Sequence, residues 1–254
     1  MSSNRTYLIT GANRGLGAAF VAHLLLRPAT TVVAAVRDPS HPTSQALASL
    51  PKSDGSALVV VKIDAAAEND PQDAIAALQR DHAITSLDVV IANAGLAHSP
   101  GRVSELSSAP ALEHFAVNSI APIRLFAASA PLLKASENPV FVALSSLVGS
   151  IAEQETLSKM FPPMFSHYGA SKAALNWFVR TLHFEEPWLA SFVIHPGLVT
   201  TDMSAAVKAS GVDFKAAGAI SPEESVEAML SVIDAADRET SGQFKKYDGT
   251  VLPW

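Results

Sequence analysis

A tyrosine and a lysine stand four positions apart in the segment Tyr168–Lys172, which opens a stretch of helical composition. Residues at i and i+4 lie one turn apart on the same face of a helix. A free tyrosine has a pKa of about 10, and a nearby ammonium group lowers it by favouring the phenolate. Such a phenol can protonate a carbonyl oxygen as a hydride reaches the carbon. That chemistry requires a nicotinamide beside the pair, so the rest of the chain must supply a dinucleotide site.

A glycine-rich turn, Thr10–Gly17, meets this requirement, since it follows a short apolar run and precedes a helical stretch ending near Leu26. Its glycines are spaced Gly-x-x-x-Gly-x-Gly. Glycines allow a tight turn and close approach to a pyrophosphate, and the helix N-terminus offers free N–H groups. The alternative is a purely structural turn. The predicted cofactor-binding residues here are Gly11, Asn13, Arg14, Gly15, Leu16 and Gly17.

The end of the second apolar run indicates which dinucleotide binds. Enzymes that use NAD place an acidic residue there for the ribose hydroxyls, whereas this chain has Val36 followed by Arg37. Together with Arg14, Arg37 suits the 2′-phosphate of NADPH, because guanidinium groups form paired hydrogen bonds with phosphate. Asp38 leaves an alternative open: if the strand ended one or two residues later, it would be the ribose ligand of NADH. In a third alternative, Arg37 and Asp38 bind no cofactor and are only surface charges in a turn.

Seven short apolar runs alternate with longer stretches rich in Ala and Leu, which predicts an α/β fold with a single doubly wound (Rossmann) parallel seven-stranded sheet and helices on both faces. We expect one domain over residues 1–254. The helix signals include the segments Asn69–Asp73 and Ser221–Glu224, and Pro122 and Pro131 predict a kink in Ala111–Lys134. The predicted strands are Tyr7–Thr10, Thr31–Val36, Ala57–Ile63, Leu87–Ala92, Val140–Leu144, Phe192–His195 and Phe244–Tyr247.

Composition narrows the functional classes. The 254 residues are 48% hydrophobic and 17% charged, with a net charge of −6, so we expect no nucleic-acid or membrane partner. No stretch approaches the ~20 apolar residues of a membrane span. The absence of cysteine excludes disulfides and thiolate chemistry, and the eight histidines show no paired metal-ligand spacing, so no metal site is predicted. The polar N-terminus leaves no room for a signal peptide, and a cytoplasmic protein is the default.

Six motifs together resemble the short-chain dehydrogenase/reductase family over essentially the whole chain. They are Thr10–Gly17, Asn93-Ala94-Gly95, Asn118, Ser145-Ser146, Tyr168–Lys172 and Pro196-Gly197. The resemblance implies that Tyr168 is the general acid/base, and that Lys172 holds the nicotinamide ribose and depresses the Tyr168 pKa. It implies that Ser146 binds the carbonyl oxygen and that Asn118 positions a water leading from Lys172 to solvent. The further cofactor contacts it implies are Asp64, Asn93, Ala94, Gly95, Pro196, Gly197, Val199 and Thr201.

Several of these assignments have alternatives. Ser145 rather than Ser146 could carry the reactive hydroxyl, although the family register favours Ser146. Asn118 could instead break a helix or hydrogen-bond within it. His167, beside Tyr168, is a proton relay, a wall of the pocket or a surface group, and the same choice applies to His195.

Two segments are expected to shape the substrate pocket. The segment of about residues 147–167 is longer than usual in the family and contains Phe161, Met164 and Phe165, which suit a flat hydrophobic substrate. Its alternative role is packing on the body or on a neighbouring subunit. Residues of about 202–219, with Gly211 and Gly218, are expected to form a mobile lid. The insertion before Tyr168 leaves both a monomer and a homo-oligomer open.

The segment Arg5–Gly17 and the ending Gln243–Trp254 resemble the fungal norsolorinic acid ketoreductase-like and sniffer-like carbonyl reductases. That resemblance implies NADPH-dependent reduction of a ketone or aldehyde on an aromatic polyketide or related small molecule of secondary metabolism. Trp254 either caps a pocket or closes the last strand against the core. The competing hypotheses are an NAD-dependent alcohol dehydrogenase, supported only by Asp38, and a non-catalytic NADP-binding redox sensor, which would not need Ser146, Tyr168 and Lys172 together.

Overall fold

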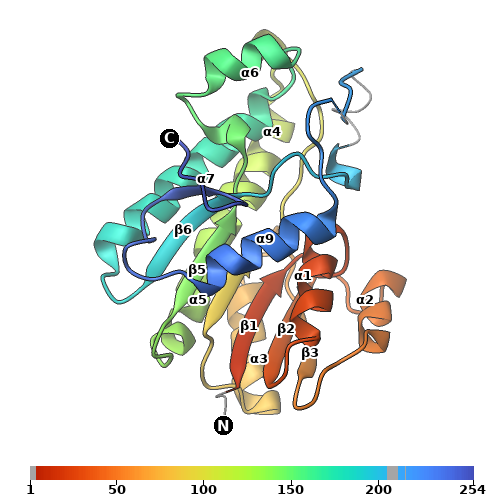
Figure 1. Ribbon diagram of the computed structural model, residues 1–254, viewed down its shortest axis with the longest axis vertical. Helices are drawn as coiled ribbons and strands as arrows, with labels where there is room; N and C mark the ends of the chain where they lie inside the picture. The colour runs from red at the N-terminus through yellow and green to blue at the C-terminus, as the bar shows by residue number, and fades with distance from the viewer. Residues whose placement is uncertain (1–3, 205–210, 215) are drawn as a thin grey trace.

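A parallel seven-stranded sheet forms the centre of the protein, with strand order β3-β2-β1-β4-β5-β6-β7 (Figure 1). The structure is a computed structural model and describes residues 4–204, 211–214 and 216–254. All seven predicted strands are present, with ends that differ from the predicted ones by at most two residues. The strands are β1 (Arg5–Thr10), β2 (Thr30–Val36), β3 (Ala57–Lys62), β4 (Val89–Ala92), β5 (Val140–Leu144), β6 (Ala190–His195) and β7 (Phe244–Lys246).

Helices cover both faces of this sheet, as predicted. One face packs on α1 (Gly15–Leu25) and α9 (Pro222–Asp234), and the other on α3 (Asp70–His82), α5 (Ala121–Leu133) and α7 (Ser166–Glu185). Because strand side chains alternate in direction, Val140 and Val142 of β5 enter the first core while Phe141 enters the second. The shorter helices are α2 (Pro42–Ala46), α4 (Ser108–Phe115) and α6 (Gln154–Met160).

The strand order reverses direction between β1 and β4, which are neighbours in the sheet although β2 and β3 separate them in the chain. In an open parallel sheet, ligands bind in the crevice outside the carboxyl ends of the strands at this switch point. The glycine turn follows β1 and the Asn93–Gly95 segment follows β4. The topology therefore brings two of the predicted cofactor-binding segments to one crevice.

The predicted helix Ala111–Lys134 is an interrupted helical run from Ser108 to Leu133. A π-helical segment, Ala116–Ile120, joins α4 to α5, and Pro122 lies in the first turn of α5, where its missing N–H is tolerated. By length and a mean hydropathy of 1.3, this 26-residue run alone among the described helices could cross a membrane. Half of its apolar window is buried within the protein, and its α5 part covers the sheet.

Candidate active site

The glycine turn is shaped by a close backbone approach. Gly11 has a φ of +63°, and a β-carbon at Gly17 would lie 2.1 Å from the Gly11 carbonyl oxygen, so no larger residue fits there. Asn93 Nδ2 donates to the Thr10 carbonyl at 2.8 Å, and Thr10 Oγ1 accepts from the Ala94 N–H at 3.0 Å. These bonds hold the segment after β4 against the turn after β1, at the start of α1.

The two arginines predicted to bind phosphate follow β1 and β2 in the chain. Arg14 is the N-cap residue of α1, and Arg37 directly follows β2; both side chains are exposed, and within the described residues neither forms an ion pair. Asp38 is committed to a turn, because its Oδ1 accepts from Ser40 N–H at 2.8 Å and from Ser40 Oγ at 2.6 Å. These hydrogen bonds lower the pKa of Asp38. The strand ends at Val36, and not later as the Asp38 alternative required.

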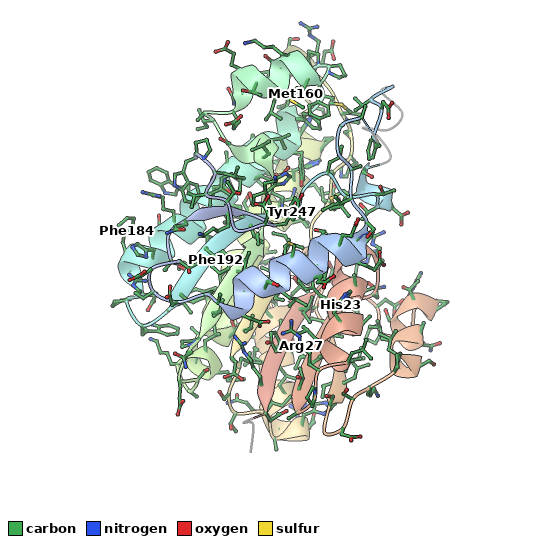
Figure 2. All side chains as sticks on the ribbon, in the orientation of Figure 1. His23, Arg27, Met160, Phe184, Phe192 and Tyr247 are labelled. Atoms are coloured by element: carbon green, nitrogen blue, oxygen red, sulfur yellow. The ribbon has the colours of Figure 1, made fainter. Side chains whose placement is uncertain are left out.

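The segment after β6 reaches the same crevice. Gly197 has a φ of +86° and lies against the ring of Tyr247, which Figure 2 labels. Val199 forms an isolated parallel bridge with Ile220. A β-carbon at Gly15 would lie 3.7 Å from Thr201 Cγ2, so the β6 segment meets the glycine turn. Asp64, which follows β3, lies at the same carboxyl edge of the sheet. Residues 205–210 and 215 of the predicted lid lie outside the described residues.

The predicted catalytic pair lies in the first two turns of α7. Lys172 is 4% exposed, and its Nζ donates to the Leu144 carbonyl at 2.7 Å and lies 5.8 Å from the centre of the Tyr168 ring. Tyr168 is half-buried and forms a side-chain hydrogen bond with Ser146, which follows β5. The structure therefore brings Ser146, Tyr168 and Lys172 together at the carboxyl ends of the strands.

The ionisation of this pair differs from the sequence-based expectation. Burial raises the pKa of Tyr168 to about 12, and only the hydrogen bond with Ser146 opposes that rise. Burial also lowers the pKa of Lys172 to about 7. The expected lowering of the Tyr168 pKa by Lys172 is absent from this arrangement, because the Nζ is turned to the Leu144 carbonyl and its own charge is poorly solvated. Tyr168 is therefore protonated at neutral pH, and burial makes it a weaker acid than a free tyrosine.

Two glycines allow the segment after β5, residues 145–149, to lie directly on α7. We refer to these residues as the serine segment. A β-carbon at Gly149 would lie 2.8 Å from the β-carbon of Lys172, and one at Gly169 would lie 2.8 Å from the Val148 carbonyl oxygen. Both distances are shorter than real side chains tolerate, so the 3₁₀ turn Leu147–Gly149 and α7 are in backbone contact. This contact holds Ser146 beside Tyr168.

Ser145 and Ser146 have different surroundings. Ser145 is 2% exposed, and its hydroxyl donates to Asn176 Oδ1 at 2.6 Å. Asn176 Nδ2 in turn donates to the Gly149 carbonyl at 3.3 Å. Ser145 thus braces the serine segment, while Ser146 faces the tyrosine, which favours Ser146 as the substrate-binding hydroxyl. Sequence reasoning missed Asn176, although its spacing of four from Lys172 places it on the same helix face.

Asn118 lies in the π-helical segment and is fully buried. Its Oδ1 accepts from Leu96 N–H at 2.9 Å, and its Nδ2 donates to the Leu96 carbonyl at 2.9 Å and to Ser171 Oγ at 3.0 Å. A β-carbon at Gly95 would lie 3.2 Å from Asn118 Oδ1 and 3.7 Å from Lys172 Nζ. Asn118 therefore joins the segment after β4 to α7 beside Lys172. Sequence reasoning also missed Ser171 as its partner.

A cluster of three histidine rings packs at the start of α7. The ring centres of His98 and His114 are 4.6 Å apart, and those of His114 and His167 are 5.6 Å apart. His114 is fully buried, its Nδ1 contacts the Pro110 carbonyl at 2.7 Å, and burial is the main cause that lowers its pKa. His167 is 5% exposed and packs against His114 within this cluster, which favours a packing role over the proton-relay hypothesis. Across the described residues no group of His, Asp or Glu side chains could hold a metal ion.

The other flanking histidine, His195, ends β6. Burial lowers its pKa to about 4, so it is neutral at physiological pH. Its Nδ1 is buried and has no hydrogen-bond partner within the described part of the chain.

The segment between Ser146 and Tyr168 contains α6, a helix that the sequence reading did not anticipate. Only Leu157 of α6 is buried, and Met160 is exposed at the top of the molecule, as Figure 2 shows. The Phe161 and Phe165 rings meet edge to face at 5.5 Å. Together with Met164 they are partly buried, so this end of the segment presents an apolar wall before Tyr168.

Comparisons with known proteins agree with this geometry. The family model for short chain dehydrogenases matches residues 5–211. A norsolorinic acid ketoreductase of Dothistroma septosporum is 40% identical over 100% of this chain and 94% of its own length, and one of Emericella nidulans is 38% identical over 100% and 95%. The structure of an NADPH-bound carbonyl reductase from chicken fatty liver superposes with a TM-score of 0.85 at 30% identity, covering 99% of this chain and 100% of the other.

The chain belongs to the short-chain dehydrogenase family. It is therefore an oxidoreductase of that type, with a nicotinamide cofactor and a Rossmann-like fold.

Proposed function

We propose that this protein is an NADPH-dependent carbonyl reductase in which Tyr168 protonates the oxygen of a ketone or aldehyde. The observation that carries the proposal is the convergence of Ser146 and Tyr168 with the buried Lys172, whose Nζ lies 5.8 Å from the centre of the Tyr168 ring. A structural serine and tyrosine would not need a buried lysine at their side, because burying an amine is costly whether or not it is protonated. The same three residues argue against a non-catalytic NADP-binding protein.

Each residue has a defined part in the proposed mechanism. The nicotinamide supplies the hydride when it is bound. Ser146 donates a hydrogen bond to the substrate oxygen and stabilises its developing negative charge. Tyr168, which is protonated at neutral pH, gives its proton to that oxygen. Lys172 holds the nicotinamide ribose, and Asn118 fixes Leu96 and Ser171 around it.

NADPH is the proposed cofactor because the phosphate-binding residues are free and the competing acid is not. Arg14 and Arg37 are exposed and unpaired among the described residues, whereas Asp38 Oδ1 is engaged by Ser40. The N-terminus of α1 has no side-chain cap, so its first N–H groups are available to a pyrophosphate. The NADPH-bound state of the chicken carbonyl reductase supports the same choice.

The proposed substrate is a hydrophobic, aromatic polyketide-type ketone bound against Phe161, Met164 and Phe165. The apolar wall before Tyr168 supports this class, and so do the names of the ketoreductases from Dothistroma and Emericella. The segment of about residues 147–167 would then be the substrate loop.

The test is the oxidation of NADPH and NADH at 340 nm with aromatic ketones, quinones and simple aldehydes. We expect NADPH-dependent turnover of an aromatic ketone by the native protein, and loss of that turnover with retained NADPH binding in Tyr168→Phe. Turnover that survives Tyr168→Phe would refute the assigned proton donor. NADPH binding without turnover of any compound would revive the redox-sensor hypothesis.

A further inference from the structure

The chain reverses direction after β7 and runs back beside it. The Lys246 N–H donates to the Thr250 carbonyl at 2.8 Å, and the Leu252 N–H donates to the Phe244 carbonyl at 2.7 Å. Gly249, with a φ of +87°, allows the turn. We refer to residues 250–254 as the strap.

The strap ends on the segment that follows Ser146. Ser150 Oγ donates to the Pro253 carbonyl at 2.9 Å, and the Ala152 N–H donates to the main-chain oxygen of Trp254 at 3.0 Å. Ser150 is 1% exposed, and its Oγ also accepts from the Glu153 N–H at 3.2 Å, immediately before α6 begins. The hydroxyl of Ser150 is therefore shared between the strap and the entry to α6.

Side-chain packing fixes the strap itself. The Trp254 ring is stacked on Phe244 with ring centres 5.6 Å apart, and the Arg180 guanidinium lies 5.0 Å from the Trp254 ring centre. Arg180 belongs to α7 and also donates to the Gly242 carbonyl at 3.2 Å. Figure 1 shows the end of the chain lying beside α7. Of the two roles foreseen for Trp254, closing the last strand is the one seen.

The substrate loop is thus tied at both ends to elements distant in sequence. Ser150 and Ala152 tie its start to the strap, while Ser166 Oγ donates to the Gly101 carbonyl at 2.7 Å at its end. Between these ties, α6 is largely exposed and buries only Leu157. The position of α6, and of the apolar wall that follows it, therefore depends on its two ends more than on packing of its own.

We propose that Ser150 and Trp254 are positioning residues for substrate specificity: the strap orients α6 and so sets the shape of the pocket for a bulky carbonyl compound. This inference rests on the proposed function, because it takes residues 147–167 as the substrate loop. Neither residue touches the catalytic side chains, so the strap should affect the binding of large substrates and leave the chemistry and the NADPH site unchanged.

The test compares Ser150→Ala with Ser231→Ala, a matched change in α9 that removes an exposed hydroxyl bonded only to the Glu227 carbonyl. For Ser150→Ala we expect about a tenfold higher KM for a bulky aromatic ketone, with an unchanged kcat, an unchanged KM for a small aldehyde and an unchanged Kd for NADPH. The Ser231→Ala variant should match the native protein. Equal losses for both substrates, or no change for either, would overturn the proposal.

A second measurement does not depend on turnover. Amide hydrogen exchange in residues 151–165 should be faster in Trp254→Ala than in the native protein, while exchange in β1 and α1 should stay the same. Unchanged exchange in residues 151–165 would overturn the positioning role. If the native protein reduced no carbonyl compound although exchange rose as expected, the proposed function would fail while the strap's hold on α6 stood.

Discussion

Gly149 and Lys172 are separated by less space than a methyl group needs, since a β-carbon on the glycine would lie 2.8 Å from the lysine β-carbon. The segment carrying Ser146 therefore rests on the backbone of the helix carrying Tyr168. The distance between the Ser146 and Tyr168 side chains depends on this backbone contact. We therefore expect the site to be sensitive to the size of the residue at position 149, although Gly149 takes no part in the chemistry.

Gly149→Ala should destabilise the protein by about 1–3 kcal/mol, the usual cost of an overpacked core. It should also lower kcat, because the serine segment must move away from Tyr168. Urea unfolding and steady-state kinetics measure the two effects. Gly101→Ala is the control, since the nearest atom to its added carbon is 3.9 Å away. Native-like activity in Gly149→Ala would show that the contact does not position Ser146.

Substitutions of the adjacent Ser145 and Ser146 should affect different properties, the free energy of unfolding for Ser145 and kcat for Ser146. Ser146→Ala should lower kcat by about 10²–10³-fold, as loss of one oxyanion donor does, with little effect on unfolding. Ser145→Ala should cost about 1–3 kcal/mol of unfolding free energy, because it leaves the buried Asn176 Oδ1 without its donor. Kinetics and urea unfolding of both variants check this. The opposite pattern would make Ser145 the reactive hydroxyl.

Arg37→Ala should raise the KM for NADPH by roughly 10–100-fold, which corresponds to the loss of charge-assisted hydrogen bonds, and should leave the KM for NADH nearly unchanged. Asp38→Ala is the matched change at the next position. It should alter neither the KM for NADPH nor the KM for NADH, because the Asp38 carboxylate accepts hydrogen bonds from Ser40 within the turn. A specific loss of NADH binding in Asp38→Ala would instead identify Asp38 as a ribose ligand.

The stability of the cofactor-free protein should rise with pH between about 7 and 9. Burial holds the pKa of Lys172 at about 7 in the folded protein, against about 10.4 in the unfolded chain. In this range the unfolded chain binds more protons, so the free energy of unfolding increases by up to about 1.4 kcal/mol per pH unit. Tyr168 does not interfere, since its pKa is raised to about 12 and its unfolded pKa is about 10.

Urea unfolding of the native protein and of Lys172→Met at pH 7, 8 and 9 measures this slope. The variant should have a flatter dependence than the native protein. Equal slopes would mean that Lys172 keeps its charge in the folded state.

The sequence was sufficient to predict the sheet, and to name the candidate site residues that the structure brings together, because both depend on local signals. Apolar runs such as Val140–Leu144 are buried on both faces and stand out without any alignment. The spacing of Tyr168 and Lys172 reflects helix geometry alone. The capping box of Ser221 and Glu224 was likewise visible, and it is present in the structure.

The features that the sequence did not reveal are set by tertiary contacts. The role of Asn176 depends on Ser145, which lies 31 positions earlier in the chain. The raised pKa of Tyr168 depends on burial and on where the Lys172 amine points, and neither can be read from spacing. The helix α6 is short and mostly exposed, so its apolar periodicity is too weak to distinguish it from a loop.

The π-helical segment Ala116–Ile120 also fixes how many residues this part of the chain can hold. A π turn accommodates one residue more than an α turn. Deleting a single residue from it would restore a continuous α-helix with α4 and α5 in nearly the same rotational register, because the π turn accommodates the extra residue locally. The α5 helix would still face the sheet, but the widened turn that carries Asn118 would close and its hydrogen bonds to Leu96 and Ser171 would be lost. The length of this turn is therefore tied to the contacts of Asn118 and not to the packing of α5 on the sheet.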